Sequence, residues 1–141
     1  NWDLVDLSAP GIPGRWLLEQ GPRALDLESL ARSSWLWDRR IALLSTLTLI
    51  RAHHFEATLR LCHLLLDDPE DLMHKACGWM LRELGKKDRA PLLDFLQSHV
   101  QDMPRTMLRY AIERFPEAER QSWLQRPSRR IRRRRWRKVH F

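Results

Sequence analysis

The sequence of 141 residues is poor in glycine, proline and cysteine, and it lacks a long apolar run. Only five glycines and eight prolines occur, and no window alternates apolar and polar residues, which argues against a sheet protein. The longest nearly apolar run, residues 41–50, includes Ser45 and two threonines and is about half as long as a membrane span. Cys62 and Cys77 form neither a Cys-x-x-Cys motif nor a disulfide framework. With no secretory signal recognisable, we expect a cytoplasmic protein of bacterial type.

Acidic residues are absent from the last part of the chain. Of the 25 lysines and arginines, nine lie in residues 126–141, which leaves 16 against 18 acids in the first 125 residues. The pI of about 10.4 therefore belongs to a short tail. We expect a helical domain at residues 1–125 and an arginine-rich, disordered tail at residues 126–141. This tail either binds nucleic acid with a strong salt dependence or is an unselected extension, and the sequence leaves both open.

Apolar residues recur at helical spacing in the near-neutral domain. The five apolar stripes lie in residues 36–50, 55–66, 72–81, 92–96 and 107–115. A composition of 43% hydrophobic and 30% charged residues excludes a disordered or fibrous protein. The sequence therefore predicts an all-α fold.

Several residues mark where these helices begin and end. Asp68 can cap the third helix, with Pro69 in its first turn. Gly85 is expected to end that helix. Pro104 is expected to open the fifth helix and Pro116 to close it.

Alternate helices align with one another at a spacing of 34 to 35 residues. Residues 40–43 (RIAL) match residues 75–78 (KACG), which match residues 109–112 (RYAI), and the position 34 before Arg40 is Asp6. Such a period is typical of stacked helix pairs in a solenoid. Arg40, Lys75 and Arg109 would then form a basic ladder on adjacent helices. The alternative is that these are ordinary solvated helix positions.

Tryptophans stand one helical turn from charged residues of this register. The pairs are Trp2 with Asp6, Trp37 with Arg40, and Trp79 with Lys75. Residues three or four apart share a helix face, so a single surface could present indoles, a carboxylate and cations. The competing interpretation is burial, because tryptophan removes a large area from water. We assign Trp16, Trp35 and Trp123 to the core.

Four sequence blocks resemble the AlkD-like DNA alkylation repair family. They are NWDLVD at residues 1–6, LWDRR at residues 36–40, HKACGWMLRE at residues 74–83 and MPRTMLRYAIE at residues 103–113. The resemblance extends over most of residues 1–124. It implies a right-handed α-solenoid of antiparallel, HEAT-like helix pairs. The chain would be the C-terminal portion of the family domain, without the helices that precede the first block.

The resemblance also implies an activity and its residues. Family members are DNA glycosylases that release N3- and N7-alkylated purines. Carried across by motif, Asp6 is the catalytic carboxylate, Trp2 and Trp79 flank the lesion nucleotide, and Arg40 is the cation beside them. The weaker candidates for DNA contact are Lys75, Arg82, Arg109 and Trp37. The chemistry suits these groups, because glycosidic cleavage leaves an oxocarbenium-like sugar that a carboxylate and electron-rich rings stabilise.

The expected partner is duplex DNA with alkylated purines, bound by a monomer that associates with the nucleoid. No metal or organic cofactor is expected. A zinc site from Cys62, His63, His74 and Cys77 is the weaker interpretation, since these residues lie on different helical faces. Two other functions stay open: a non-catalytic helical module that binds DNA, and a protein-interaction solenoid. The sequence does not rank 3-methyladenine against 7-methylguanine.

Overall fold

The computed structural model describes residues 26–130, and within them every regular element is helical. The elements are α2 (Leu27–Ala31), α3 (Leu36–Arg51), α4 (Glu56–Leu64), the 3-10 turn η1 (Leu65–Asp67), α5 (Asp71–Lys87), α6 (Arg89–His99), α7 (Arg105–Ala111) and α8 (Glu117–Gln125). The all-α prediction is confirmed for this part of the chain. Trp2, Asp6 and Trp16 lie outside the described residues, as do residues 131–141.

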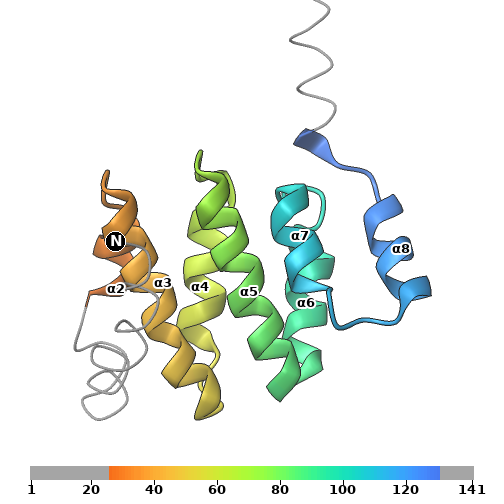
Figure 1. Ribbon diagram of the computed structural model, residues 1–141, viewed down its shortest axis with the longest axis horizontal. Coiled ribbons are helices and arrows are strands. Elements are labelled where there is room, and N and C mark those ends of the chain that lie inside the picture. The colour runs from red at the N-terminus through yellow and green to blue at the C-terminus, as the bar shows by residue number, and fades with distance from the viewer. Residues whose placement is uncertain (1–25, 131–141) are drawn as a thin grey trace, which may run out of the picture.

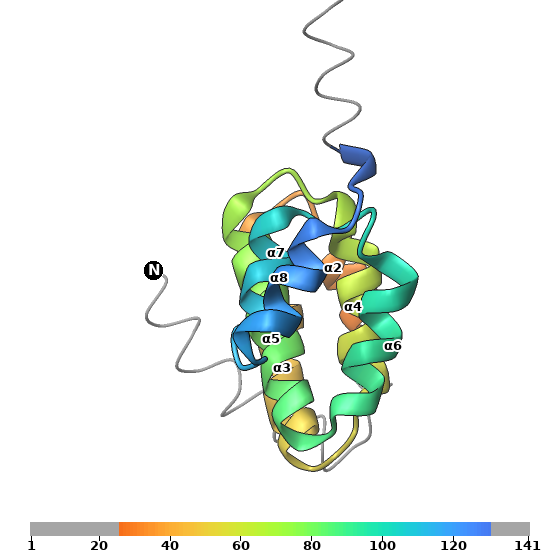
Figure 2. The ribbon, with the colours of Figure 1, turned by 90° about the vertical axis from the view of Figure 1, so that its right-hand side faces the viewer.

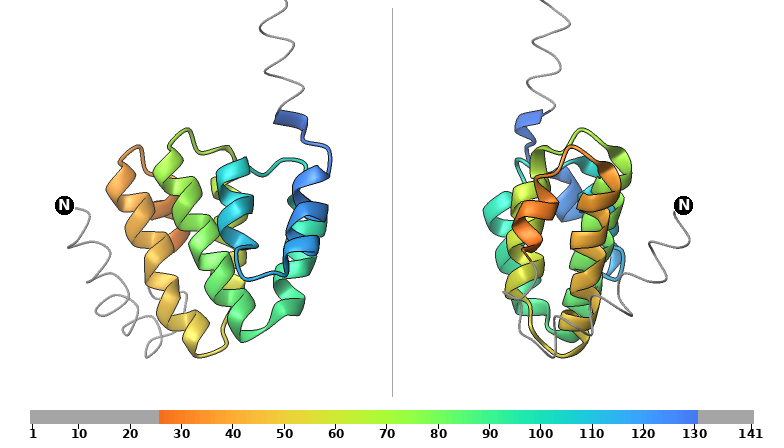
Figure 3. Two further views of the ribbon diagram at one scale, coloured as in Figure 1. Left: turned by 45° about the vertical axis from the view of Figure 1, so that its right-hand side comes forward. Right: turned by 90° about the vertical axis from the view of Figure 1, so that its left-hand side faces the viewer.

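The helices stack in two layers. Helices α3, α5 and α7 lie side by side and run in the same direction, with α5 packed between the other two (Figure 1). We call these three the front layer. Helices α2, α4 and α6 form the rear layer behind them (Figure 2). Each helix of the rear layer leads by a short turn into an antiparallel helix of the front layer, and α8 packs on α7 (Figure 3).

The core lies between the two layers, and both α3 and α5 contribute many buried side chains to it. Met73, Met80 and Leu81 of α5 are fully buried, as predicted for the third apolar stripe, and Leu84, beyond the predicted stripe, is buried as well. Leu72 is the exception, because it lies on the outer side of α5 and is exposed. No helix in residues 26–130 combines the length and the apolar character that crossing a membrane requires.

The predicted start of the third helix is wrong by two residues. The helix α5 begins at Asp71, its N-cap is Glu70, and Pro69 lies before it. Asp68 lies two residues before the N-cap, where its carboxylate accepts from the Glu70 amide and also forms an ion pair with Arg39 of α3. The same carboxylate therefore bonds both to the local backbone and to a distant cation, and the second contact is one that the local sequence did not indicate.

The predicted end of the third helix is also wrong. Gly85 lies inside α5, which continues to Lys87. A Cβ atom at Gly85 would lie 2.4 Å from Cδ2 of Leu92, so this glycine serves the packing of α6 on α5. Asp88 then ends α5 and caps α6, its carboxylate accepting from the Ala90 amide at 3.1 Å.

The fifth helix begins after Pro104, as predicted, but α7 ends at Ala111 and Pro116 instead caps α8. Trp123 of α8 is buried, so its assignment to the core is confirmed. The same assignment is wrong for Trp35, which is 69% exposed. Trp35 is the N-cap of α3 and therefore precedes the inward-facing stripe of that helix.

Candidate nucleic-acid interface

The outer surface of α5 carries most of the residues that the sequence singled out. Leu72, Lys75, Trp79, Arg82 and Lys86 occur at i, i+3, i+7, i+10 and i+14, which places them along one side of the helix. None of the five is buried, whereas the opposite side of α5 forms the core. The stripe is the middle of a mixed aromatic and cationic surface.

The neighbouring helices extend this surface. Trp37 and Arg40 belong to α3, and Arg109 and Tyr110 belong to α7. Helix α7 comes close to α5 at Gly78, where a Cβ atom would lie 2.5 Å from Cβ of Tyr110 and 2.6 Å from the Met107 carbonyl oxygen. We call the outer stripes of α3, α5 and α7 together the front face.

The three ladder residues differ sharply in their surroundings. Arg40 is only 8% exposed, and its guanidinium donates to the Leu72 carbonyl oxygen at 3.3 Å, across the junction of α3 and α5. Lys75 is half-exposed and pairs with Asp71 at 3.5 Å. Arg109 is exposed and makes no polar contact with the described residues. Arg40 is therefore not an ordinary solvated helix position, whereas Arg109 has the surroundings of one.

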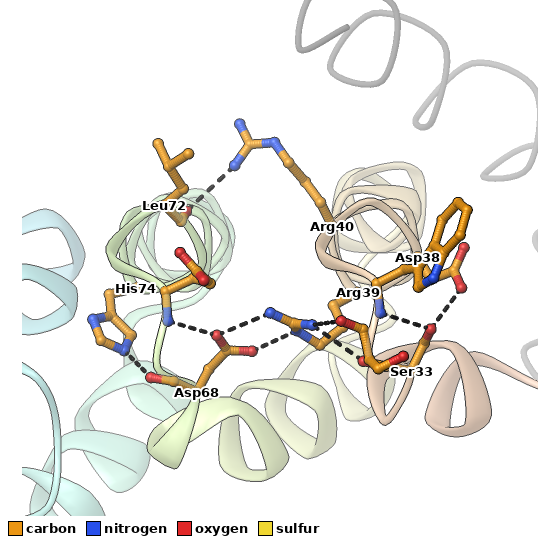
Figure 4. A network of polar contacts seen from close by, with 10 residues as sticks. Ser33, Asp38, Arg39, Arg40, Asp68, Leu72 and His74 are labelled. Carbon is orange, nitrogen blue, oxygen red and sulfur yellow. Dashed lines mark hydrogen bonds and ion pairs between the residues drawn. The ribbon is translucent and has the colours of Figure 1, made fainter.

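Arg40 follows a buried arginine that sequence reasoning did not single out. Arg39 donates from Nε to Oδ2 of Asp68 at 2.7 Å and from Nη2 to Oδ1 at 3.3 Å (Figure 4). Its Nη1 donates to the carbonyl oxygens of Ser33 and Ser34, both at 3.1 Å. The pair is almost fully buried, with 11% of the Arg39 side chain and 3% of the Asp68 side chain exposed.

This network joins three segments of the chain. Asp68 also accepts from the Glu70 amide at 2.9 Å, and its carbonyl oxygen contacts Nε2 of His74 in α5 (Figure 4). Arg39 thus ties α3 and the turn before it to the segment that leads into α5. Arg40, the next residue, reaches the first turn of α5 through its own bond to Leu72. The sequence feature that could have revealed Arg39 is the doublet Arg39-Arg40, of which only Arg40 was predicted to be a functional residue.

The remaining candidates are partly committed to the fold. Trp79 is partly buried and packs against the core. Trp37 is also partly buried. Arg82 forms an ion pair with Glu113, which follows α7, so its charge is compensated within the protein.

Three acids beside this surface are paired with cations as well. Asp71 contacts Lys75, Glu83 contacts Lys86 at 3.1 Å, and Glu113 contacts Arg82. These three carboxylates are therefore neutralised within the protein, whereas the Asp38 carboxylate of α3 accepts from the Ser33 hydroxyl at 2.6 Å. Asp6, the predicted catalytic carboxylate, and Trp2 lie outside the described residues.

The two cysteines are separate from this face. Cys62 and Cys77 are buried where α4 meets α5, and the Cys62 thiol donates to the Cys77 carbonyl oxygen at 3.8 Å. Burial raises the pKa of the Cys77 thiol well above its usual value, and the neighbouring Cys62 adds to this effect. Among the described residues no group of three or more His, Cys, Asp or Glu side chains could hold a metal ion.

Comparison with known protein families shows which family the chain belongs to. The family model described as DNA alkylation repair enzyme matches residues 1–115, which include the first block and all three front-layer helices. The chain belongs to this family. It is therefore a protein of DNA alkylation repair that interacts with DNA, and the resemblance seen in the sequence blocks is confirmed. Neither a curated protein nor a solved structure matches the chain significantly. Helix α8 and the arginine-rich segment lie beyond the residues matched to the family.

Proposed function

We propose that this alkylation repair protein is a DNA glycosylase, a hydrolase of the N-glycosidic bond of cationic N3- and N7-alkylated purines in duplex DNA. One observation supports this most: the Arg40 side chain is nearly buried and its guanidinium donates to the Leu72 carbonyl oxygen, one helix away from Trp79 and Lys75. A cation fixed in place before DNA arrives can bind a phosphate with little loss of side-chain freedom.

The alkylated base needs little catalytic help to leave. An N3- or N7-alkylated purine already carries positive charge and leaves readily once the glycosidic bond stretches. The sugar becomes oxocarbenium-like, and a negative group placed beside it lowers the barrier. In this proposal Asp6 supplies that charge and orients the attacking water. Trp2 and Trp79 offer their electron-rich faces to the cationic sugar or base.

The other cations bind the backbone in this proposal. Arg40 holds the phosphate nearest the lesion, with Lys75 and Arg109 on the neighbouring helices as further phosphate contacts. Arg82 can join them only by exchanging Glu113 for a phosphate, so we expect its contribution to be smaller. Trp37 lies one turn before Arg40 and would pack against the same strand.

The architecture that we propose is a right-handed, HEAT-like solenoid. Its support is the 34- to 35-residue register, which falls on three adjacent, parallel helices of one layer. The duplex would lie along the front face and expose its backbone to Arg40. We further propose a cytoplasmic monomer that needs no metal or organic cofactor.

A non-catalytic DNA-binding module is the second candidate. The observation that favours it is the pairing of Asp71, Glu83 and Glu113 with cations, which engages these three carboxylates within the protein. The two candidates therefore differ in the role of Asp6.

The decisive experiment measures release of 7-methylguanine and 3-methyladenine from methylated duplex DNA. We expect release by the wild type and a loss of at least about a hundredfold in Asp6→Asn, because one preorganised electrostatic group contributes that much. Duplex affinity should be retained. The matched control is Asp94→Asn, since Asp94 is an exposed carboxylate on α6 of the rear layer.

Normal release by Asp6→Asn would contradict the role given to that carboxylate. Salt-sensitive duplex binding without release by the wild type would favour the non-catalytic module. In that case Arg40→Gln should weaken binding, whereas Asp6→Asn should not.

A further inference from the structure

Each helix of the front layer carries one large apolar side chain that is exposed to solvent. Within residues 26–130 the exposed large apolar side chains are Trp35 at the N-cap of α3, Leu72 on α5 and Tyr110 on α7. They are 69%, 38% and 37% exposed, whereas α2, α4, α6 and α8 carry none. We call these three residues the apolar set. Single apolar groups on a surface are common, but their confinement to one layer indicates a shared role.

The same three helices carry the cations of the predicted ladder. Each member of the apolar set shares its helix with one cation, and the pairs are Trp35 with Arg40, Leu72 with Lys75, and Tyr110 with Arg109. Arg40 also connects two of these pairs, because its guanidinium donates to the Leu72 carbonyl oxygen at 3.3 Å. The front face therefore combines groups that suit phosphates with groups that suit the apolar parts of a nucleic acid.

Hydrogen bonds fix the turn that presents Trp35, the most exposed member of the set. The Ser33 hydroxyl accepts from the Trp35 amide at 3.1 Å and donates to Oδ2 of Asp38 at 2.6 Å. The carbonyl oxygens of Ser33 and Ser34 both accept from the buried guanidinium of Arg39 (Figure 4). The backbone at Trp35 is thus ordered before a partner binds. An indole with two rotatable side-chain bonds then loses little further freedom on binding.

We propose that the apolar set contacts deoxyribose rings and base edges of the DNA whose phosphates the ladder cations bind, with Trp35 as the principal contact. The inference rests on DNA binding by the front face, which is part of the proposed function. DNA is the partner that we infer because the chain belongs to a DNA alkylation repair family and a cation accompanies each apolar group. A DNA strand offers the matching combination, since sugar and base surface lies between successive phosphates.

The apolar set and the cations affect binding in different ways. Each contact between a cation and a phosphate releases counterions and contributes about 0.9 to the slope of log K against log salt. An apolar contact releases no counterions, and its burial raises the affinity at every salt concentration. Loss of an apolar contact therefore lowers the affinity and leaves the slope unchanged, whereas loss of a cation lowers both.

The test measures binding of full-length variants to an undamaged duplex of about 20 base pairs at about 50 to 300 mM KCl, followed by fluorescence anisotropy. We expect Trp35→Ala to bind at least about fivefold more weakly, because stacking of an aromatic ring on a base contributes that much. Leu72→Ala and Tyr110→Ala should each lose about twofold, because less of each side chain is exposed for contact. All three variants should keep the wild-type salt slope.

Two control variants accompany these measurements. His54→Ala removes an exposed aromatic ring beyond the opposite end of α3 and should bind as the wild type does. Arg109→Gln removes a front-face cation and should lower the slope by about one. Wild-type affinity of Trp35→Ala, with the variant folded by circular dichroism, would overturn the proposal. An equal loss in His54→Ala, or a lower slope in Trp35→Ala, would overturn it as well.

A conservative variant separates contact by the ring from a structural role. Trp35→Phe keeps an aromatic ring, so its affinity should stay within about twofold of that of the wild type. Duplex binding should protect wild-type tryptophan fluorescence from quenching by acrylamide, and this protection should be smaller in Trp35→Phe, which lacks the exposed indole. Equal protection in the two proteins would show that DNA does not cover Trp35 and would overturn the proposal.

The result can be distinguished from the fate of the proposed function. Base release reports on the glycosylase alone, so a wild type without release whose affinity still falls in Trp35→Ala would contradict only the glycosylase. A lower slope in Arg109→Gln with unchanged affinity of all three alanine variants would contradict only the apolar set. Its partner would then be a protein surface rather than DNA.

Discussion

The front and rear layers are built from the same helix pairs but use their charged residues differently. In the front layer, Arg39 and Arg40 reach across helix boundaries and are buried in doing so. In the rear layer, charged residues pair at the surface: Arg60 contacts Glu28 at 3.2 Å with 65% and 40% of their side chains exposed. Buried charges need partners at defined places, whereas exposed ones do not. The position of the front-layer helices therefore depends on buried charged groups and their partners, whereas that of the rear-layer helices does not.

The largest effect should come from removing one partner of the buried pair. Asp68→Asn leaves the Arg39 guanidinium buried without a counter-charge, and we expect a loss of about 3–5 kcal/mol in the free energy of unfolding. Glu28→Gln, which breaks the exposed rear pair, should cost less than about 1 kcal/mol. Urea denaturation of both variants measures the difference. Equal losses would show that the two layers do not differ in this respect.

A loss of stability of intermediate size should distinguish a glycine packed within the front layer from one packed between the two layers. Gly78→Ala puts a methyl group against the Met107 backbone, which cannot move by itself, and should cost about 2 kcal/mol despite the better helix propensity of alanine. Gly85→Ala meets only the tip of the Leu92 side chain, which can rotate, so its stability should stay within about 1 kcal/mol of wild type. Thermal or urea unfolding of the two variants measures both losses of stability. A larger loss in Gly85→Ala than in Gly78→Ala would contradict this prediction.

The smallest effect concerns the rear layer and pH. Burial lowers the pKa of His99, and the nearby His63 adds to this, while Asp102 opposes it. A histidine with a lowered pKa binds its proton more weakly in the folded state, so stability falls as the pH drops below about 6.5. His99→Gln should make the decline between pH 7.5 and 5.5 shallower in urea unfolding. A steeper decline in this variant would contradict the interpretation.

The helical stripes could be predicted because helix period and burial are local and repetitive. The core positions of α5 and the register of α3, α5 and α7 follow from apolar spacing and from the 34- to 35-residue repeat. Helix boundaries could not be predicted as well, because the residues at helix ends also make contacts with distant segments. Asp68 was predicted to cap the third helix, but it lies two residues before the N-cap and binds both the Glu70 amide and Arg39, which is 29 residues earlier in the chain.

The candidate site likewise combines features that local spacing predicts with features that depend on distant contacts. Arg39 and Arg40 are adjacent and chemically identical, and the repeat register selected only the second. In the structure both are buried, the first by Asp68 and the second at the first turn of α5. Their roles differ because successive residues of a helix point about 100° apart, so each meets a different neighbour.

By itself, the sequence determined the helical class, the inward stripes, the repeat register and the family blocks, since each depends on residue types at fixed spacing. Only the tertiary structure decided that Gly85 packs a helix rather than ending one, that Trp35 is exposed and that Arg130 bridges two turns. Such outcomes depend on which distant segment lies opposite a side chain. Burial and long-range pairing arise only when the two layers assemble, so a local sequence pattern does not predict them.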